Sequence, residues 1–129
     1  MSLLSELLLA LAHWVWHFSS TRGDRRRIAQ GLVRCAVRAG HGRVSNIGTE
    51  WSVGTGTLTP GLLRFEPQLG VVGVRKIPVH RIRGIGTVPV EHVVVPWEDS
   101  AHLEVDTGAG ELHLIVPAQV AGDVVERLS

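Results

Sequence analysis

The segment AHLEVDTGAGELHLIVP, residues 101–117, decides the fold class. Apolar and polar side chains alternate on both sides of its centre, which is the period of a half-buried β-strand. Gly108-Ala109-Gly110 at the centre is a glycine-containing turn, so the segment predicts a β-hairpin. The inward side chains would be Leu103, Val105, Leu112, Leu114 and Val116, and the outward ones His102, Glu104, Asp106 and His113.

The chain before this hairpin alternates in the same way. Gly54 and Gly56 indicate a bend or bulge in one strand, Pro60-Gly61 is a turn, and residues 84–89 look like a loop. With the two arms of the hairpin, the pattern predicts about seven short strands. Those upstream of the hairpin are expected at residues 32–39, 50–57, 62–67, 73–79 and 91–97.

The last twelve residues predict a helix that starts at Pro117, because Val120, Val124 and Leu128 recur at helical spacing. A closing helix can cover the open end of a strongly bent sheet. We therefore expect a mainly β fold, a bent sheet or small barrel of about seven strands, capped by this helix and preceded by an N-terminal hydrophobic helix.

Length and composition limit the protein to a small class. A chain of 129 residues fits one domain with at most one appended element, and 44% hydrophobic residues exclude wholesale disorder. A single cysteine, Cys35, excludes a disulfide framework and cysteine-rich zinc sites. The formal net charge of +1 is unevenly distributed, since residues 21–43 carry +6 and residues 44–129 carry −4. Such segregation indicates an anionic partner near the front of the chain.

The front of the chain is predicted to contact a membrane. Residues 3–18 read LLSELLLALAHWVWHF, a helix-forming stretch with Glu6 as its only charge and a length near the minimum for crossing a bilayer. Aromatic residues followed by arginines are typical of a membrane exit, and the positive-inside rule places the arginines and the domain in the cytoplasm, at the inner membrane. The expected membrane-surface residues are Trp14, Trp16, Phe18, Arg22, Arg25, Arg26 and Arg27.

Two alternatives remain for this helix. Its polar residues fall on one stripe interrupted by Leu9, which also fits an amphipathic helix lying in the membrane interface. In a soluble protein, the same apolar face could instead pack on the domain or form the interface of a homo-oligomer. A cleaved signal peptide fits poorly, because a basic n-region is missing.

The pattern divides the chain into a hydrophobic membrane helix (1–20), an arginine-rich juxtamembrane linker (21–30) and a β-domain (31–129). Near an anionic leaflet, each arginine contributes on the order of 1 kcal/mol to membrane binding. A solvated linker whose charge only sets orientation explains the same residues. Nucleic acid is not expected as a partner, because the domain is net negative and lacks an aromatic and basic stacking face.

Gly56–Pro67, GTLTPGLLRFEP, resembles the Leu-Thr step, turn and Leu-x-Phe of GRAM domains, members of the pleckstrin-homology (PH) superfold. Residues 77–82 and the hairpin-plus-helix ending fall in matching places. The whole chain also resembles a family of short uncharacterised actinobacterial membrane proteins. The resemblance implies a non-catalytic binding or scaffolding module, with lipid headgroups and an unidentified protein as partners.

No motif in the sequence predicts an enzyme, a cofactor or a metal. Asp106-Thr107-Gly108 matches the active-site turn of aspartic proteases, but only twenty residues follow Ala109, so a hairpin turn explains it better. His13 and His17 lack the glutamate of HExxH, and the other histidines lack ligand spacing; His113 would form a cross-strand pair with Glu104 or Asp106. Catalytic, cofactor-binding and metal-ligating residues are therefore predicted as none, and Cys35 is expected to be buried and inert.

Overall fold

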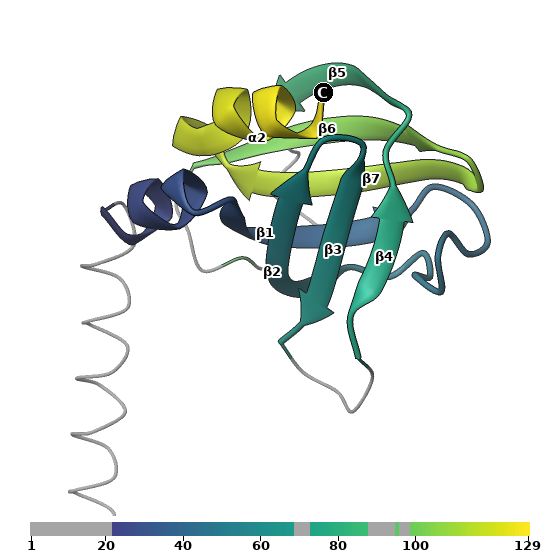
Figure 1. Ribbon diagram of the computed structural model, residues 1–129. Coiled ribbons are helices and arrows are strands. Elements are labelled where there is room, and N and C mark those ends of the chain that lie inside the picture. The colour runs from purple at the N-terminus through teal and green to yellow at the C-terminus, as the bar shows by residue number, and fades with distance from the viewer. Residues whose placement is uncertain (1–21, 69–72, 88–94, 96–98) are drawn as a thin grey trace, which may run out of the picture.

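A computed structural model describes residues 22–68, 73–87, 95 and 99–129. Seven antiparallel strands form one sheet in the order β4-β3-β2-β1-β7-β6-β5, and the sheet curls into a half-barrel (Figure 1). The strands are β1 (Leu32–Ala39), β2 (Ser52–Thr59), β3 (Leu62–Pro67), β4 (Arg75–Pro78), β5 (Arg81–Thr87), β6 (Ser100–Thr107) and β7 (Gly110–Pro117).

The mainly β fold and the hairpin are confirmed, and β1 and β3 have the predicted bounds. The loop expected at residues 84–89 is wrong for its first part, because β5 continues to Thr87. Its glycines weaken the strand signal, but β5 is an edge strand with an irregular register between Ile82 and Gly84, where glycine is tolerated. Of the strand expected at 91–97, only Val95 is described, and it is not in a strand; the rest lies outside the described residues.

The core lies on the concave face of the sheet. The predicted alternation of the hairpin is confirmed, since Leu103, Val105, Leu112, Leu114 and Val116 are all buried. They pack with the buried side of β1 and with three buried residues of the C-terminal segment, Val120, Val124 and Leu128. This segment is a short 3₁₀ turn (η1, Ala118–Val120) followed by α2 (Ala121–Leu128), so the closing helix is confirmed (Figure 1). Pro117 ends β7 and precedes the helix as its cap.

Cys35 lies in this core without exposed surface. Burial raises the pKa of its thiol to about 12. Because the thiolate is the reactive form, burial and the raised pKa make this thiol a poor nucleophile in the folded protein.

The glycines of β2 allow neighbouring side-chain and backbone atoms to approach the strand closely. The pairing of β2 with β1 and with β3 runs without a register shift, so the bulge considered for Gly54 and Gly56 is wrong. A Cβ atom at Gly56 would press against Leu63 and Cys35, and one at Gly54 would overlap the backbone carbonyl of Glu66. Glycine at these positions provides space rather than an irregular backbone.

Replacing Gly54 with alanine is expected to destabilise the protein by about 1–3 kcal/mol or more, because backbone atoms of β3 must move away from the new methyl group. Urea unfolding measures this change. Gly84→Ala is the matched control, since a Cβ there meets no atom within 4 Å. A Gly54→Ala protein as stable as the Gly84→Ala protein would contradict the close approach.

Candidate functional site

The arginine-rich segment is helical over residues 22–29 and packs against the domain, where the sequence indicated a linker (Figure 1). Asp24 and Ile28, one turn apart, are buried. Arg22, Arg25 and Arg26 are exposed and, at helical spacing, lie on the opposite side. These three residues are called the arginine face below.

A buried ion pair fixes this helix to the sheet. Arg34 of β1 donates two hydrogen bonds to the carboxylate of Asp24, from Nε to Oδ1 at 2.7 Å and from Nη2 to Oδ2 at 2.6 Å. Their side chains are only 6% and 2% exposed. Gln119 of η1 also donates to Asp24, at 3.4 Å, and Arg127 of α2 donates to the carbonyl oxygen of Ala29. The arginine face is therefore held in a defined position on the domain.

The predicted membrane-surface residues differ in their exposure. Arg22, Arg25 and Arg26 share the exposed face, whereas Arg27 is half-buried and forms an ion pair with Asp24 at 3.4 Å. Trp14, Trp16, Phe18 and the rest of the predicted helix at 1–20 lie outside the described residues. Among the residues described, none forms a helix that has both the length and the apolar character needed to cross a bilayer.

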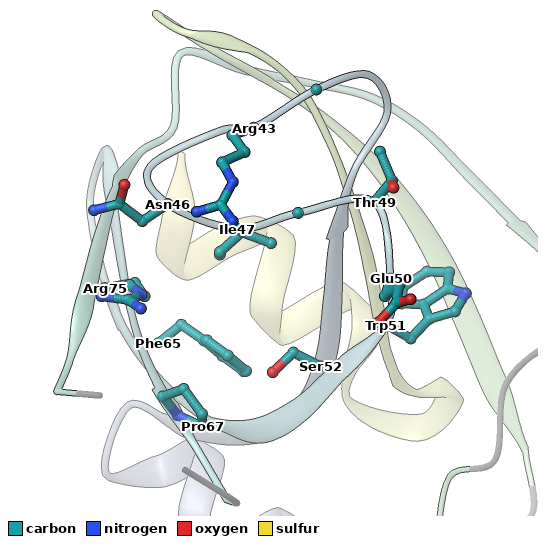
Figure 2. Close-up of a pocket in the computed structure, with 12 residues that line it drawn as sticks. Arg43, Asn46, Ile47, Thr49, Glu50, Trp51, Ser52, Phe65, Pro67 and Arg75 are labelled. Atoms are coloured by element: carbon teal, nitrogen blue, oxygen red, sulfur yellow. The ribbon is translucent and has the colours of Figure 1, made fainter. Parts of the chain in front are cut away.

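A cavity of about 600 Å³ opens at the end of the half-barrel, between the loop that joins β1 to β2 and strands β3 and β4 (Figure 2). Arg43 and Ile47 project from the loop toward Phe65 and Ser52 below them (Figure 2). The lining is completed by backbone and side-chain atoms of Gly42, Asn46, Gly48, Thr49, Glu50, Trp51, Pro67 and Arg75.

The lining of the cavity offers charged and polar groups for binding. Arg43 and Arg75 contribute two guanidinium groups to the lining, and Glu50 contributes one carboxylate. Guanidinium groups hold carboxylates and phosphates through charge-assisted hydrogen bonds. The other polar side chains of the lining include the hydroxyl groups of Thr49 and Ser52 and the amide of Asn46.

The outer face of the hairpin carries a second group of polar side chains. His113 lies opposite Glu104 in the register, which decides between the two partners considered from the sequence. His102 Nε2 and His113 Nδ1 are 2.7 Å apart and share a hydrogen bond. Trp51 meets the ring of His102 edge-on at 6.5 Å between centroids, and its own ring lies under the guanidinium of Arg38 at 5.1 Å.

Both histidines of this pair have a lowered pKa. Burial is the largest cause of the lowered pKa in both residues. The nearby His113 lowers the pKa of His102 further, and the nearby Arg38 lowers the pKa of His113 further. Nearby carboxylates act in the opposite direction but are weaker. The pair therefore favours its neutral form near neutral pH.

The protease-like tripeptide forms the hairpin turn. Asp106 pairs with Arg83 at 2.7 Å, and the Thr107 hydroxyl donates to the carbonyl oxygen of Gly110. The same hydroxyl accepts a hydrogen bond from the backbone N–H of Ala109. The two hydrogen bonds of Thr107 close the turn, which agrees with the prediction that this tripeptide leads into a hairpin turn.

The cavity, the buried Asp24–Arg34 pair and the histidine hydrogen bond were not predicted from the sequence. Each joins residues from separate elements. Asp24 lies in a helix and Arg34 in a strand, and the ten-residue separation between them matches no sequence pattern that indicates a contact. The chain matches no known family model, and neither curated proteins nor solved structures show significant similarity to it.

Proposed function

We propose that this protein is a non-catalytic, membrane-anchored binding module that presents its β-domain at the cytoplasmic face of the inner membrane. The observation that carries the proposal is the arginine face. Its three exposed guanidinium groups follow directly on the apolar segment 3–18 and are tied to the domain through Asp24 and Arg34.

The helix of residues 22–29 holds these charges in fixed positions on the domain. A flexible linker would leave each arginine free to stay in water, whereas a helix packed on the sheet presents three of them together. Arg22, Arg25 and Arg26 make no ion pair with the described residues, so their charge is available to an external anion. Three such charges near an anionic leaflet contribute about 3 kcal/mol, which is roughly a hundredfold in partitioning.

The domain itself is proposed to be PH/GRAM-like. A single curled sheet of seven antiparallel strands with a C-terminal helix is consistent with that superfold. A module of this kind would bind lipid headgroups or a protein segment. The two edges of the sheet, β4 and β5, would accept a segment of the protein partner by strand addition.

Binding of the full chain to vesicles tests the proposal. The wild-type chain is expected to partition about a hundredfold more strongly into vesicles rich in phosphatidylglycerol than into phosphatidylcholine vesicles, at low salt. The variant Arg22→Gln/Arg25→Gln/Arg26→Gln should lose most of this preference. Both proteins should stay with the bilayer in alkaline carbonate, because the apolar segment inserts independently of the arginines.

The matched control removes the same charge elsewhere. Arg64, Lys76 and Arg81 are exposed on β3, β4 and β5, and their triple glutamine variant should keep the preference for anionic vesicles. If this control loses as much binding as the first variant, the arginine face has no special role. A full chain that is soluble without detergent as a defined oligomer would favour the alternative, in which residues 3–18 form the interface of a homo-oligomer.

A further inference from the structure

We propose that Glu104, Glu111 and His113 bind a divalent transition-metal ion, Zn²⁺ being the best fit, on the outer face of the β6–β7 hairpin. Each side chain offers one ligand atom, and these atoms lie within 4.8 Å of one another. The site is separate from the arginine face, so it goes beyond the proposed membrane function.

The hairpin fixes the three positions. Glu104 of β6 lies directly opposite His113 of β7, and Glu111 precedes His113 by two residues on the same face of the strand. The two strands pair without a shift from Ser100 to Thr107, and the Thr107 side chain closes their turn. Ligands on paired strands are held more accurately than ligands on loops.

The donor set suits zinc. One imidazole nitrogen and two carboxylate oxygens are ordinary Zn²⁺ ligands, and three protein ligands leave a fourth position for water. Ligand atoms about 2.1 Å from a tetrahedral ion lie about 3.4 Å apart, so separations of up to 4.8 Å between the observed atoms need to shorten by up to about 1.4 Å. Rotation about the side-chain bonds of the two glutamates provides this without a change in the backbone.

His102 prepares His113 for this role. A metal-bound histidine normally donates its other ring N–H to a fixed acceptor, which orients the ring. Here Nδ1 of His113 lies 2.7 Å from Nε2 of His102, while its Nε2 lies 3.4 Å from Oε1 of Glu111. With the ion on Nε2, the Nδ1–H donates to His102, and Trp51 holds His102 from the side.

The charges around the site leave one carboxylate without a cation. Arg83 bonds both Glu111, at 2.8 Å, and Asp106, at 2.7 Å, whereas half-buried Glu104 has no hydrogen bond or ion pair with the described residues. Gly84, opposite Glu104 in the register, leaves open space beside it. An ion therefore satisfies Glu104 and competes with Arg83 for Glu111.

Titration of the full chain with Zn²⁺ against a chromogenic chelator tests the site. We expect one ion per chain, and a loss of at least tenfold in affinity in both His113→Ala and Glu104→Gln. His102→Phe should weaken binding by about 10–100-fold although it removes no ligand. Arg83→Gln should tighten binding, because Glu111 loses its competing partner.

The control is His41→Ala, which removes an exposed histidine from the loop between β1 and β2 and should leave the affinity unchanged. Thermal melting with and without Zn²⁺ distinguishes a loss of binding from a loss of folding, because each variant is compared with itself. Zn²⁺ should raise the Tm of the wild type and of His41→Ala, but not that of His113→Ala. Equal Zn²⁺ affinity of the wild type and His113→Ala, or weaker binding by Arg83→Gln, would overturn the proposal.

Discussion

Replacing Asp24 with alanine is expected to destabilise the protein by about 3–5 kcal/mol, the usual cost of removing one partner from a buried ion pair. The guanidinium of Arg34 would stay buried while losing the two short hydrogen bonds that Asp24 accepts. The helix at residues 22–29 would also lose its main polar contact with the sheet. Urea unfolding of the full chain in a mild detergent measures the change.

Two variants separate the ion pair from general disturbance of the helix. Asp24→Leu combined with Arg34→Met replaces both charges with apolar groups, and such exchanges are often close to neutral, so this protein should be much more stable than Asp24→Ala. Arg25→Ala alters an exposed neighbour on the same helix and should change stability by less than about 0.5 kcal/mol. A cost below 1 kcal/mol for Asp24→Ala would show that the helix does not depend on this pair.

Replacing Phe65 with alanine is expected to destabilise the protein by about 3–5 kcal/mol, because its ring is fully buried in the hydrophobic core. Domains of this kind are typically stable by about 5–15 kcal/mol, so the substitution removes a large part of the total. Gly56 lies opposite Phe65 in the register and offers no side chain to fill the space. Thermal and urea unfolding would both report the loss.

Val74→Ala is the matched comparison for this substitution. Val74 is a large apolar residue that remains 43% exposed, so shortening it should change stability by less than about 0.5 kcal/mol. Equal effects of the two substitutions would contradict the packing of Phe65 in the core.

Much of the fold could be predicted from the sequence because apolar side chains that alternate along the strands fill the concave face of the sheet. Alternation along β1, β6 and β7 identifies the inward side chains, and the turns at Gly61 and around Ala109 identify neighbouring strands. β5 was not predicted, because its glycines interrupt the alternation of apolar and polar side chains that identifies a strand. The part of the chain that the structure describes holds seven strands, but β5 was not among the predicted ones, and the strand expected at 91–97 lies, except for Val95, outside that part.

The candidate sites were less predictable, since each depends on partners from different elements. Nothing in the spacing of Asp24 and Arg34 shows that a helix would cover the outer side of β1. Both arms of the hairpin place a histidine and a glutamate two residues apart, but without the register either arm reads as an exposed polar face. Only the pairing of Glu104 with His113 brings the carboxylates and imidazoles into one group.

The place of β1 in the sheet has a consequence for how the chain folds during synthesis. β1 pairs with β2, which follows it closely, but also with β7, so Val37 meets Leu114 across most of the domain. The strands on either side of the β1–β7 pairing can form as local hairpins. The pairing of β1 with β7 closes a long loop of chain, and this closure has an entropic cost. The half-barrel therefore cannot close until β7 has left the ribosome. Until then, the apolar side chains of β1 lack the contacts with β7 and the C-terminal helix that bury them in the folded protein.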